Sequence, residues 1–433
     1  MNIQKYHQAV KMGNLYTQMG KIDKIVGMTI EATGSASNIG DVCHILAEKS
    51  KTILAEVIGF KENKVLLMPY EEIEGVGYGS IVKNTGGKLK IRMSDQLIGR
   101  TVDAMGHPID GKGDIGGSQY YSIGGTASNP MNRPRISEPI ELGIKAIDGL
   151  LTMGKGQRMG IFAGSGVGKS TLMGMIARKV KADINVIALV GERGREVVEF
   201  INRDLGPEGI QRSVLVVATS DQPAMMRSKC ALTATTIAEY FRDQGKDVLL
   251  MMDSLTRFAM AQREIGLSIG EAPVARGYTP SIYTAMPKLL ERSGNFERGS
   301  ITGIYTVLVE GDDANEPISD IVRGIIDGHI MLSRKIAAKN HYPAIDVLSS
   351  VSRLMTEITS KDQQATAGRL RNLLSIYNTN QDLITIGAYK QGTNAELDYA
   401  ISRIGELNRF LQQQVDEQFS FEDTVSLLQQ AVG

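Results

Sequence analysis

Residues 159–171 read MGIFAGSGVGKST, and this stretch decides the fold of the chain. The apolar residues 159–162 predict a short buried strand, and the apolar residues 172–177 predict the helix that follows. The loop between them matches the phosphate-binding pattern G-x-x-x-x-G-K-[ST], except that Ala163 replaces the first glycine. A Gly/Ser turn with a chance Gly-Lys-Ser is the alternative interpretation, but a strand, a loop and a helix in this order favour a phosphate site.

Each part of this loop has a role in holding phosphate groups. Gly164, Gly166 and Gly168 let successive backbone N–H groups turn toward a phosphate, and the N-terminus of the following helix adds its positive dipole end. Lys169 supplies a positive charge for the β- and γ-phosphates, and Ser170 supplies a hydroxyl ligand for Mg²⁺. We expect the whole loop to bind the nucleotide, and its residues are Ala163, Gly164, Ser165, Gly166, Val167, Gly168, Lys169, Ser170 and Thr171.

Two acidic residues follow apolar runs elsewhere in the chain. Asp253 ends the run 248–252, so its carboxylate is expected at the edge where α/β sheets bind ligands and would hold Mg²⁺ through a water molecule. Glu192 also follows an apolar run, and a carboxylate there can polarise the water that attacks the γ-phosphate. Because five charged residues fall between Glu192 and Glu199, spacing alone leaves a solvated charge cluster as an equal alternative.

Composition bounds the kind of protein. A length of 433 residues suggests two or three domains. The 48 basic and 48 acidic residues give a formal net charge of zero, so no bulk attraction to nucleic acid or anionic lipid is implied. Cys43 and Cys230 are the only cysteines, and they have no metal-like spacing. Without a leader-like or membrane-length apolar run, we expect a cytoplasmic protein.

Three regions follow one another along the chain. Residues 21–93 alternate β-rich runs, such as the run Ile25–Ile30, with glycine-containing turns, and this predicts a small barrel or sandwich. In residues 94–360, strand-like runs alternate with helical stretches, which predicts an α/β fold with a mostly parallel sheet. Residues 361–433 carry apolar residues at helical spacing, which predicts a C-terminal helical domain.

Five segments resemble a known family, and the resemblance covers nearly the whole chain. Residues 343–352 (PAIDVLSSVS) resemble the signature segment of the rotary ATPase α/β superfamily, and residues 191–196 (GERGRE) resemble its catalytic glutamate motif. More specific similarity is found in residues 235–243 (TTIAEYFRD), 253–259 (DSLTRFA) and 271–280 (EAPVARGYTP). These resemble the flagellar protein-export ATPases and their close relatives, the injectisome type III secretion ATPases.

The resemblance implies a RecA-like P-loop ATPase core with an N-terminal β-barrel and a C-terminal helical domain, assembled as a homohexamer. It implies ATP as the substrate and Mg²⁺ as the cofactor, with Lys169 on the phosphates and Ser170 and Asp253 on the metal. It assigns Glu192 to the attacking water and Arg193 to the positioning of that glutamate.

The resemblance also implies two residues that act beyond the phosphate loop. Arg353 matches the arginine finger that reaches the γ-phosphate bound on the neighbouring subunit; without the resemblance it would be a surface arginine at a loop end. Tyr342 matches the aromatic residue that stacks on adenine. The second adenine-facing aromatic of the rotary β subunit has no counterpart near residues 412–414, so the base pocket is half assigned.

Several functions remain in competition. The resemblance favours an ATPase that energises flagellar protein export, releasing and unfolding substrates and their chaperones at the export gate, with the injectisome ATPase as the alternative. A subunit of a rotary ATP synthase or vacuolar ATPase shares the fold, but residues 235–243 and 271–280 count against it. A hexameric RNA-translocating helicase would require a basic, aromatic surface, and this chain has no tryptophan and no basic excess, so we expect no nucleic-acid partner.

Two segments are expected to meet partners. Residues 1–20 predict a possible amphipathic helix, and a short run frayed at the terminus is the alternative interpretation from sequence alone. The helix resembles the segment that binds the FliH-type stator and acidic lipid, and this implies peripheral association with the inner face of the cell membrane. The Gly- and Pro-containing loop 270–278 predicts an ordered turn. In rotary ATPases the matching loop faces the central hole, so we expect Val274 and Tyr278 to meet a FliJ-type coiled-coil stalk or passing substrate.

Overall fold

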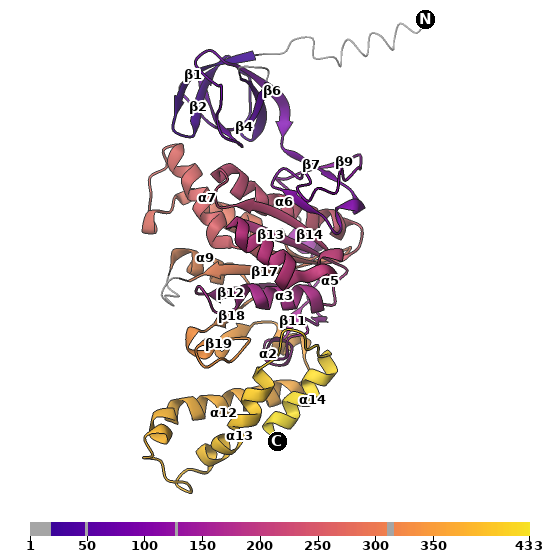
Figure 1. Cartoon of the computed structure of the whole chain (residues 1–433), viewed down its shortest axis with the longest axis vertical. Coiled ribbons are helices and arrows are strands. Elements are labelled where there is room, and N and C mark those ends of the chain that lie inside the picture. Colours follow the sequence, from indigo (N-terminus) through magenta and orange to yellow (C-terminus); the bar gives the residue numbers. More distant parts are fainter. Residues whose placement is uncertain (1–18, 48–50, 126–128, 310–315) are drawn as a thin grey trace, which may run out of the picture.

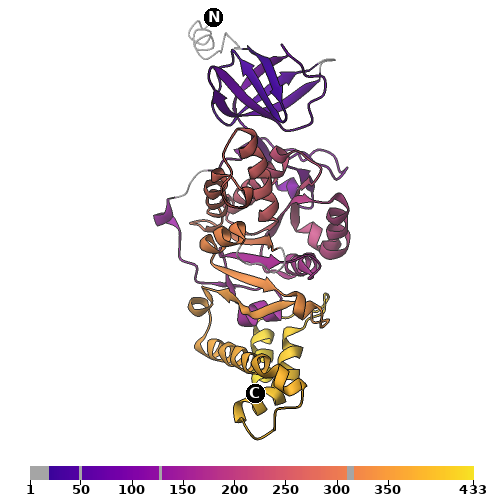
Figure 2. The ribbon, with the colours of Figure 1, turned by 90° about the vertical axis from the view of Figure 1, so that its left-hand side faces the viewer.

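The computed structural model describes residues 19–47, 51–125, 129–309 and 316–433. Three parts follow one another along the longest axis of the chain, with a β-barrel at one end, an α/β domain in the centre and a group of helices at the other end (Figures 1 and 2). The expected N-terminal helix falls almost wholly on residues 1–18, which lie outside the described residues, and the first strand already begins at Met19.

The N-terminal part is a closed antiparallel barrel in the order β1-β2-β5-β4-β3-β6. Alternate residues of its strands fill the barrel, as in β4, where Ile53, Ala55 and Val57 are buried. The run Ile25–Ile30 is not one strand, because Gly27 adopts a φ of +57° and turns the chain between two strands. The six strands are β1 (Met19–Val26), β2 (Thr29–Thr33), β3 (Asp41–Leu46), β4 (Thr52–Lys61), β5 (Lys64–Pro69) and β6 (Ile81–Lys88).

The central domain is built on a nine-stranded sheet in the order β19-β18-β12-β17-β15-β13-β14-β8, with β16 paired to β17. All pairs are parallel except β18–β19 and β16–β17. The strands are β8 (Thr101–Asp103), β12 (Arg158–Ala163), β13 (Ile184–Glu192), β14 (Ser213–Thr219), β15 (Asp247–Asp253), β16 (Gly294–Asn295), β17 (Ser300–Leu308), β18 (Gly328–Leu332) and β19 (Ile345–Ser352).

Helices cover both faces of this sheet, which explains why its strands are apolar throughout. In β13, Ile187 and Leu189 face one hydrophobic core and Val186, Ala188 and Val190 face the other. The first core is shared with α3 (Lys169–Lys179), α4 (Gly194–Glu199), the π-helix η4 (Phe200–Leu205) and α5 (Gly206–Gln211). The second core is shared with α6 (Ala224–Asp243), α7 (Leu255–Ser268), α8 (Pro280–Leu290) and α9 (Pro317–Ile325).

Short strands join the barrel to the central domain. The strand β7 (Lys90–Met93), which the sequence assigned to the barrel region, instead pairs with β9 (Gln119–Ser122). Its Ile91 and Met93 are buried in the second core of the central domain, because their apolar side chains face that core rather than the barrel interior. A second ladder joins β10 (Pro139–Ile140) to β11 (Met153–Gly154), and short 3₁₀ turns lie at η2 (Asp95–Leu97) and η3 (Pro130–Asn132).

The C-terminal helices pack on the first core. Ala400, Leu407 and Leu411, three of the apolar residues at helical spacing in the sequence, are buried in that core, and Leu397 is buried as well. The C-terminal helices are α12 (Lys361–Thr385), α13 (Ala395–Leu411) and α14 (Phe421–Val432). The short helices α2 (Lys145–Leu150), α10 (Arg334–Ala337) and α11 (Met355–Ile358) precede them along the chain. Across the described ranges, no helix combines the length and apolar character needed to cross a lipid bilayer.

A buried ion pair attaches the barrel to the central domain. The Lys229 ammonium group of α6 lies 2.8 Å from Glu56 Oε1 and 2.7 Å from Glu56 Oε2 on β4. The Tyr70 hydroxyl donates a hydrogen bond to the same carboxylate, and Val42 and Met225 close an apolar cluster around the group. Because both oxygens of Glu56 are satisfied at a nearly dry interface, this contact fixes how the barrel sits on α6.

We expect Lys229→Met to loosen the barrel from the central domain. The substitution leaves the largely buried Glu56 carboxylate without its cation, and the loss of one partner costs up to about 3–5 kcal/mol when an ion pair is fully buried. The thermal midpoint should fall by several degrees, and limited proteolysis should cut the connection between barrel and domain faster. Arg409→Met, which removes the exposed pair with Glu406, is the control and should change neither measurement appreciably. Equal midpoints for both variants would contradict the role of Lys229.

Candidate active site

The candidate site lies at the carboxyl edge of the parallel sheet. Strands β12, β13 and β15 end there at Ala163, Glu192 and Asp253. The parallel pairing of β13 with β15, in which Leu189 is opposite Asp253, brings the two carboxylates to neighbouring strand ends. The phosphate loop, residues 163–171, leads from β12 into α3 beside them. The arrangement predicted from the sequence is therefore assembled at one edge.

The backbone N–H groups of the phosphate loop and of the start of α3 are placed to bind an anion. Gly166 and Gly168 have φ values of +77° and +86°, which other residues rarely adopt, so these glycines are required by the loop's path. The N-terminus of α3 begins after Gly168 and receives no side-chain cap. Its first amide groups and dipole are thus directed at a space suited to an anion.

Gly164 lies close to a charged side chain. A Cβ atom there would lie 2.8 Å from Nε and Nη2 of Arg334, the first residue of α10. The Arg334 guanidinium therefore lies beside the loop backbone at Gly164. No local sequence pattern marks Arg334, because its place beside the loop depends on the pairing of β18 with β12.

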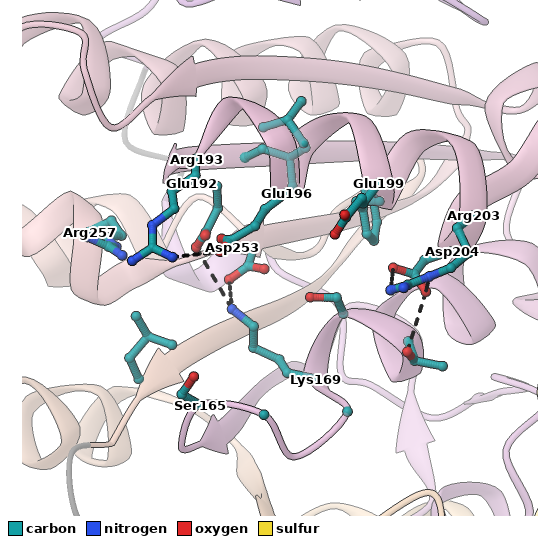
Figure 3. Close-up of a pocket in the computed structure, with 18 of the residues that line it drawn as sticks. Ser165, Lys169, Glu192, Arg193, Glu196, Glu199, Arg203, Asp204, Asp253 and Arg257 are labelled. Atoms are coloured by element: carbon teal, nitrogen blue, oxygen red, sulfur yellow. Dashed lines mark hydrogen bonds and ion pairs between the residues drawn. The ribbon is translucent and has the colours of Figure 1, made fainter.

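Lys169, Glu192 and Asp253 converge on one point (Figure 3). The Lys169 ammonium group forms an ion pair with Asp253 Oδ1 and lies 3.9 Å from Glu192 Oε1. The Thr306 hydroxyl of β17 donates a hydrogen bond of 2.7 Å to Asp253 Oδ1 and so fixes the orientation of that carboxylate. All three charged side chains line a cavity of about 400 Å³ together with Ser165, Ser170 and the glycines of the loop.

The Glu192 carboxyl is held in an unusual environment. Glu192 is 9% exposed, and its Oε1 atom is buried with no hydrogen-bond partner among the described residues. Burial, reinforced by the nearby Asp253 carboxylate, raises the pKa of Glu192 to about 7, although Lys169 opposes the shift. A carboxyl group with a pKa near 7, one oxygen of which makes no hydrogen bond, is suited to accept a proton from water.

The donor set fits Mg²⁺ bound together with a phosphate. Ser170 and Asp253 offer one hydroxyl and one carboxylate beside the loop, and Mg²⁺ is usually held by one or two carboxylates plus substrate phosphates and water. Within the described ranges, no group of three or more His, Cys, Asp or Glu residues is placed to hold a metal by itself. A metal at this edge would thus depend on the phosphate oxygens for the rest of its ligands.

Two arginines near the carboxylates occupy different positions. The Arg193 side chain is 76% exposed and pairs with Glu196 at 3.4 Å, so in this chain it contacts Glu196 rather than Glu192. Arg257 lines the cavity and its charge lowers the pKa of Glu192, and its Nε is buried without a hydrogen-bond partner. Arg257 was not among the residues predicted from the sequence, where its one signal is its position four residues after Asp253, in the first turn of α7.

A second cavity, of about 590 Å³, adjoins the phosphate loop, and we name it the base cavity after the position expected for adenine. Tyr342 lines it, and a Cβ atom on Gly168 would lie 3.4 Å from the Tyr342 ring. The opposite wall is the segment 412–415, which is joined to Tyr342 by a hydrogen bond of 3.0 Å from Gln413 N–H to the Tyr342 carbonyl. The base cavity therefore has one aromatic wall and one wall of amide and aliphatic side chains.

Helix α3 connects the two cavities mechanically. It begins at Lys169 in the phosphate loop, and in its last turn Arg178 donates a hydrogen bond of 3.2 Å to the Val415 carbonyl. Lys179 donates to the Glu417 carbonyl beside it, and burial lowers the pKa of Lys179 to about 8. One helix thus holds both the phosphate loop and the wall of the base cavity.

Arg353 lies outside both cavities of its own chain. It follows β19, its side chain is exposed, and its Nη2 donates a hydrogen bond of 3.3 Å to the Arg323 carbonyl on α9. The structure therefore does not bring Arg353 to the phosphate loop of the same subunit.

The loop 270–278 is ordered as a turn, as its glycine and proline content predicts. Val274 N–H donates to the Tyr278 carbonyl at 2.8 Å, and Val274 is 58% exposed. Tyr278, expected to meet a partner, is only 3% exposed and lies in the core beneath Arg263. The expectation for Tyr278 is wrong, because this aromatic side chain anchors the turn and is not presented at its surface.

Comparison with known protein families gives three matches along the chain. Residues 22–86 match the β-barrel domain of the ATP synthase alpha/beta family, and residues 143–352 match its nucleotide-binding domain. Residues 359–430 match the T3SS EscN ATPase C-terminal domain.

Individual proteins are similar over nearly the full length. The flagellum-specific ATP synthase of Bacillus subtilis is 54% identical over 100% of this chain and 99% of its own length. The type 3 secretion system ATPase of Xanthomonas euvesicatoria is 50% identical over 94% of this chain and 93% of its own length. The assembled ATPase EscN of the enteropathogenic E. coli type III secretion system, 46% identical, has a TM-score of 0.91 over 96% of this chain and 100% of that chain. EscN in complex with its central stalk EscO has a TM-score of 0.89.

The raised pKa of Glu192 predicts how the stability of the nucleotide-free protein depends on pH. Because the folded protein holds this proton up to about pH 7 while the unfolded chain releases it near 4.5, the contribution is present at low pH and is lost as pH rises through 7. Glu192→Gln removes that loss. The free energy of unfolding of the variant, relative to that of wild type, should therefore rise by about 2–3 kcal/mol between pH 5 and pH 8.

Thermal midpoints of both proteins at the two pH values measure this difference. Glu199→Gln is the control in the same cavity, because the pKa of Glu199 is lowered by its hydrogen bond with Arg195 and no such gain should appear. A difference between Glu192→Gln and wild type that stays constant with pH would show that Glu192 titrates normally.

Proposed function

This chain belongs to the type III protein-export ATPases of the ATP synthase α/β family, and from this we propose how its cavities bind and hydrolyse ATP. The protein is an ATPase of type III export. The observation that carries the proposed mechanism is the convergence of Lys169, Glu192 and Asp253 beside the phosphate loop.

The phosphates of ATP bind the backbone N–H groups of the loop and the N-terminus of α3. Lys169 turns from Asp253 toward the β- and γ-phosphates, because these phosphates together carry more negative charge than the Asp253 carboxylate. Glu192 accepts a proton from the water that attacks the γ-phosphorus, the bond to the bridging oxygen breaks, and ADP and phosphate are released. The Arg257 guanidinium, which lines the same cavity, is placed to stabilise negative charge on the γ-phosphate oxygens.

Mg²⁺ would be held by Ser170 and Asp253 together with phosphate oxygens, and when bound it neutralises charge on the transferred group. Tyr342 would stack on the base in the base cavity, with residues 412–415 on the other side. Amide side chains there can donate or accept, so stacking rather than a fixed hydrogen-bond pattern would orient the base.

Arg353 is proposed to act on the site of the neighbouring subunit in a homohexamer. Two observations support this: its exposed position outside its own cavities, and the similarity to EscN, which has been solved as an assembled ATPase. Its guanidinium would stabilise the charge that develops on the γ-phosphate next door. Arg193, at the rim of the cavity with Glu196, is proposed to help place Glu192 only when the assembled site closes.

We assign the ATPase to flagellar export, because the flagellum-specific relative is 54% identical and covers the chain completely. The injectisome is the second candidate, with a relative at 50% identity. Export substrates and their chaperones are the proposed cargo. A FliH-type stator and the inner face of the membrane at the export gate are proposed contacts of the N-terminal segment, of which residues 1–18 lie outside the described residues.

The loop 270–278 is proposed to meet a FliJ-type central stalk. EscN, with which this chain shares 46% identity, has been solved with its central stalk EscO. Val274 presents an aliphatic side chain at the tip of an ordered turn, while Tyr278 below it keeps the turn in place. An ordered apolar tip loses little conformational entropy when it meets a coiled coil.

We predict that Lys169→Ala and Glu192→Gln fail in different ways. Lys169→Ala removes a phosphate contact from the ground state and the transition state, so both ATP affinity and turnover should fall. Glu192→Gln keeps the shape of the side chain but cannot accept the proton, so ATP should still bind while hydrolysis falls by about 100-fold or more. Titration with a fluorescent ATP analogue and phosphate release measure the two quantities. Glu192→Gln turning over ATP at the wild-type rate would overturn the assignment.

For the loop, Val274→Asp should weaken stimulation of the ATPase by the stalk protein several-fold, because it places a charge at an apolar contact. Basal ATPase activity and hexamer formation should stay at the wild-type level. Val26→Asp is the matched control, an exposed valine on β1 with 54% exposure, and should leave stimulation intact. If Val274→Asp abolishes assembly together with basal activity, the loop serves the subunit interface instead.

A further inference from the structure

Arg323, on α9, has an environment that packing alone does not explain. Its guanidinium lies over the ring of Phe162 at 5.0 Å from the ring centroid, and its Nη2 lies 3.6 Å from the sulfur of Met331. Its Nε is buried without a hydrogen-bond partner, and among the described residues no carboxylate forms an ion pair with it. Arg323 is half-buried, and its charge is held by an aromatic face and a thioether rather than by a carboxylate of the described residues.

Phe162 connects Arg323 to the phosphate site. It is the residue of β12 immediately before Ala163, and its ring is fully buried. The ring also contacts His329 of β18 edge-on, with centroids 5.9 Å apart. A shift of the strand end that carries the phosphate loop would therefore press directly on the Arg323 guanidinium.

Arg323 is connected to Arg353 through its backbone. Arg353 Nη2 donates a hydrogen bond of 3.3 Å to the Arg323 carbonyl, and Arg353 N–H donates one of 3.0 Å to the Asp327 carbonyl. The Arg323 carbonyl belongs to the last turn of α9, whose free carbonyl groups form the negative end of the helix dipole. Arg353 is thus docked on the end of helix α9 of its own subunit.

We propose that Arg323 is a positioning residue that links a subunit's own phosphate-loop strand to the arginine that it gives to its neighbour. The proposal rests on the proposed role of Arg353 in the neighbouring site. When the loop closes on phosphate, the end of β12 moves Phe162, Arg323 and the last turn of α9 together. That movement changes how firmly the Arg323 carbonyl holds Arg353. Nucleotide binding in one subunit therefore controls whether its Arg353 is available to the site of the neighbouring subunit.

The test compares substitutions that break the link at different points. Arg323→Gln removes the charge, Arg323→Lys keeps it, and Phe162→Leu removes the aromatic face while keeping an apolar core residue. Arg369→Gln is the matched control, because Arg369 lies over the Tyr399 ring at 5.3 Å in the C-terminal helices, away from Arg353. Each variant is measured as hexamer, with Mg²⁺ and ATP, for kcat, KM, affinity for a fluorescent ATP analogue and thermal midpoint.

We expect Arg323→Gln to lower kcat about tenfold while analogue affinity stays within about twofold of wild type, because the subunit's own site is intact. Arg323→Lys should recover most of the rate, and Phe162→Leu should lose about threefold. Arg323→Gln combined with Arg353→Ala should be no slower than Arg353→Ala alone in single-turnover measurements, since both act through one group.

The results that would overturn the proposal can be told apart from those that would overturn the proposed role of Arg353. Arg323→Gln and Phe162→Leu with wild-type kcat, or losses for Arg323→Gln and Arg353→Ala that multiply in the double variant, would show that Arg323 does not act through Arg353. If Arg353→Ala itself hydrolyses ATP at the wild-type rate, the role of Arg353 in the neighbouring site fails, and the link fails with it. An inactive Arg353→Ala with a fully active Arg323→Gln overturns the link alone.

Discussion

The placement of the Lys169 ammonium group between two carboxylates is the interaction on which the rest of the structure depends. Glu192 and Asp253 end neighbouring strands of a parallel sheet, and without a cation between them their mutual repulsion and desolvation would oppose the fold. The sheet order, the left-handed glycines of the loop and the start of α3 all serve to bring that lysine to the strand ends. The same three groups are the ones that an incoming triphosphate must rearrange.

Much of this arrangement was predictable from the sequence, because it is encoded locally. The apolar runs that became β12, β13, β14, β15 and β17 are buried on both faces, and such strands read as continuous hydrophobic segments. The phosphate loop has a glycine at each point where the backbone needs one. The fold class expected from the sequence, an α/β core between a barrel and a helical domain, is confirmed.

The rest depends on contacts between distant segments, which no local pattern encodes. Tyr278 and Val274 stand four residues apart in one loop, yet only the structure shows that the first is buried and the second exposed. Arg257 and Arg193 are both ordinary helix-start arginines in the sequence, and tertiary packing alone directs the first into the cavity and the second to its rim. Likewise, a single glycine divided the run Ile25–Ile30 into two strands, because apolar content does not reveal a positive φ.

Helix α3 holds the phosphate loop at one end and the wall of the base cavity at the other. In the proposed binding mode, a nucleotide would therefore meet two half-sites at a fixed separation, and the second contact would form at the high effective concentration that a rigid connection provides. Base and phosphates would bind as the two arms of a chelate, so neither free phosphate nor a free nucleoside would reproduce the affinity of the intact nucleotide. Once the bond to the γ-phosphate is cut, the released phosphate would keep only one arm and ADP would keep both, so phosphate would be the product held more weakly.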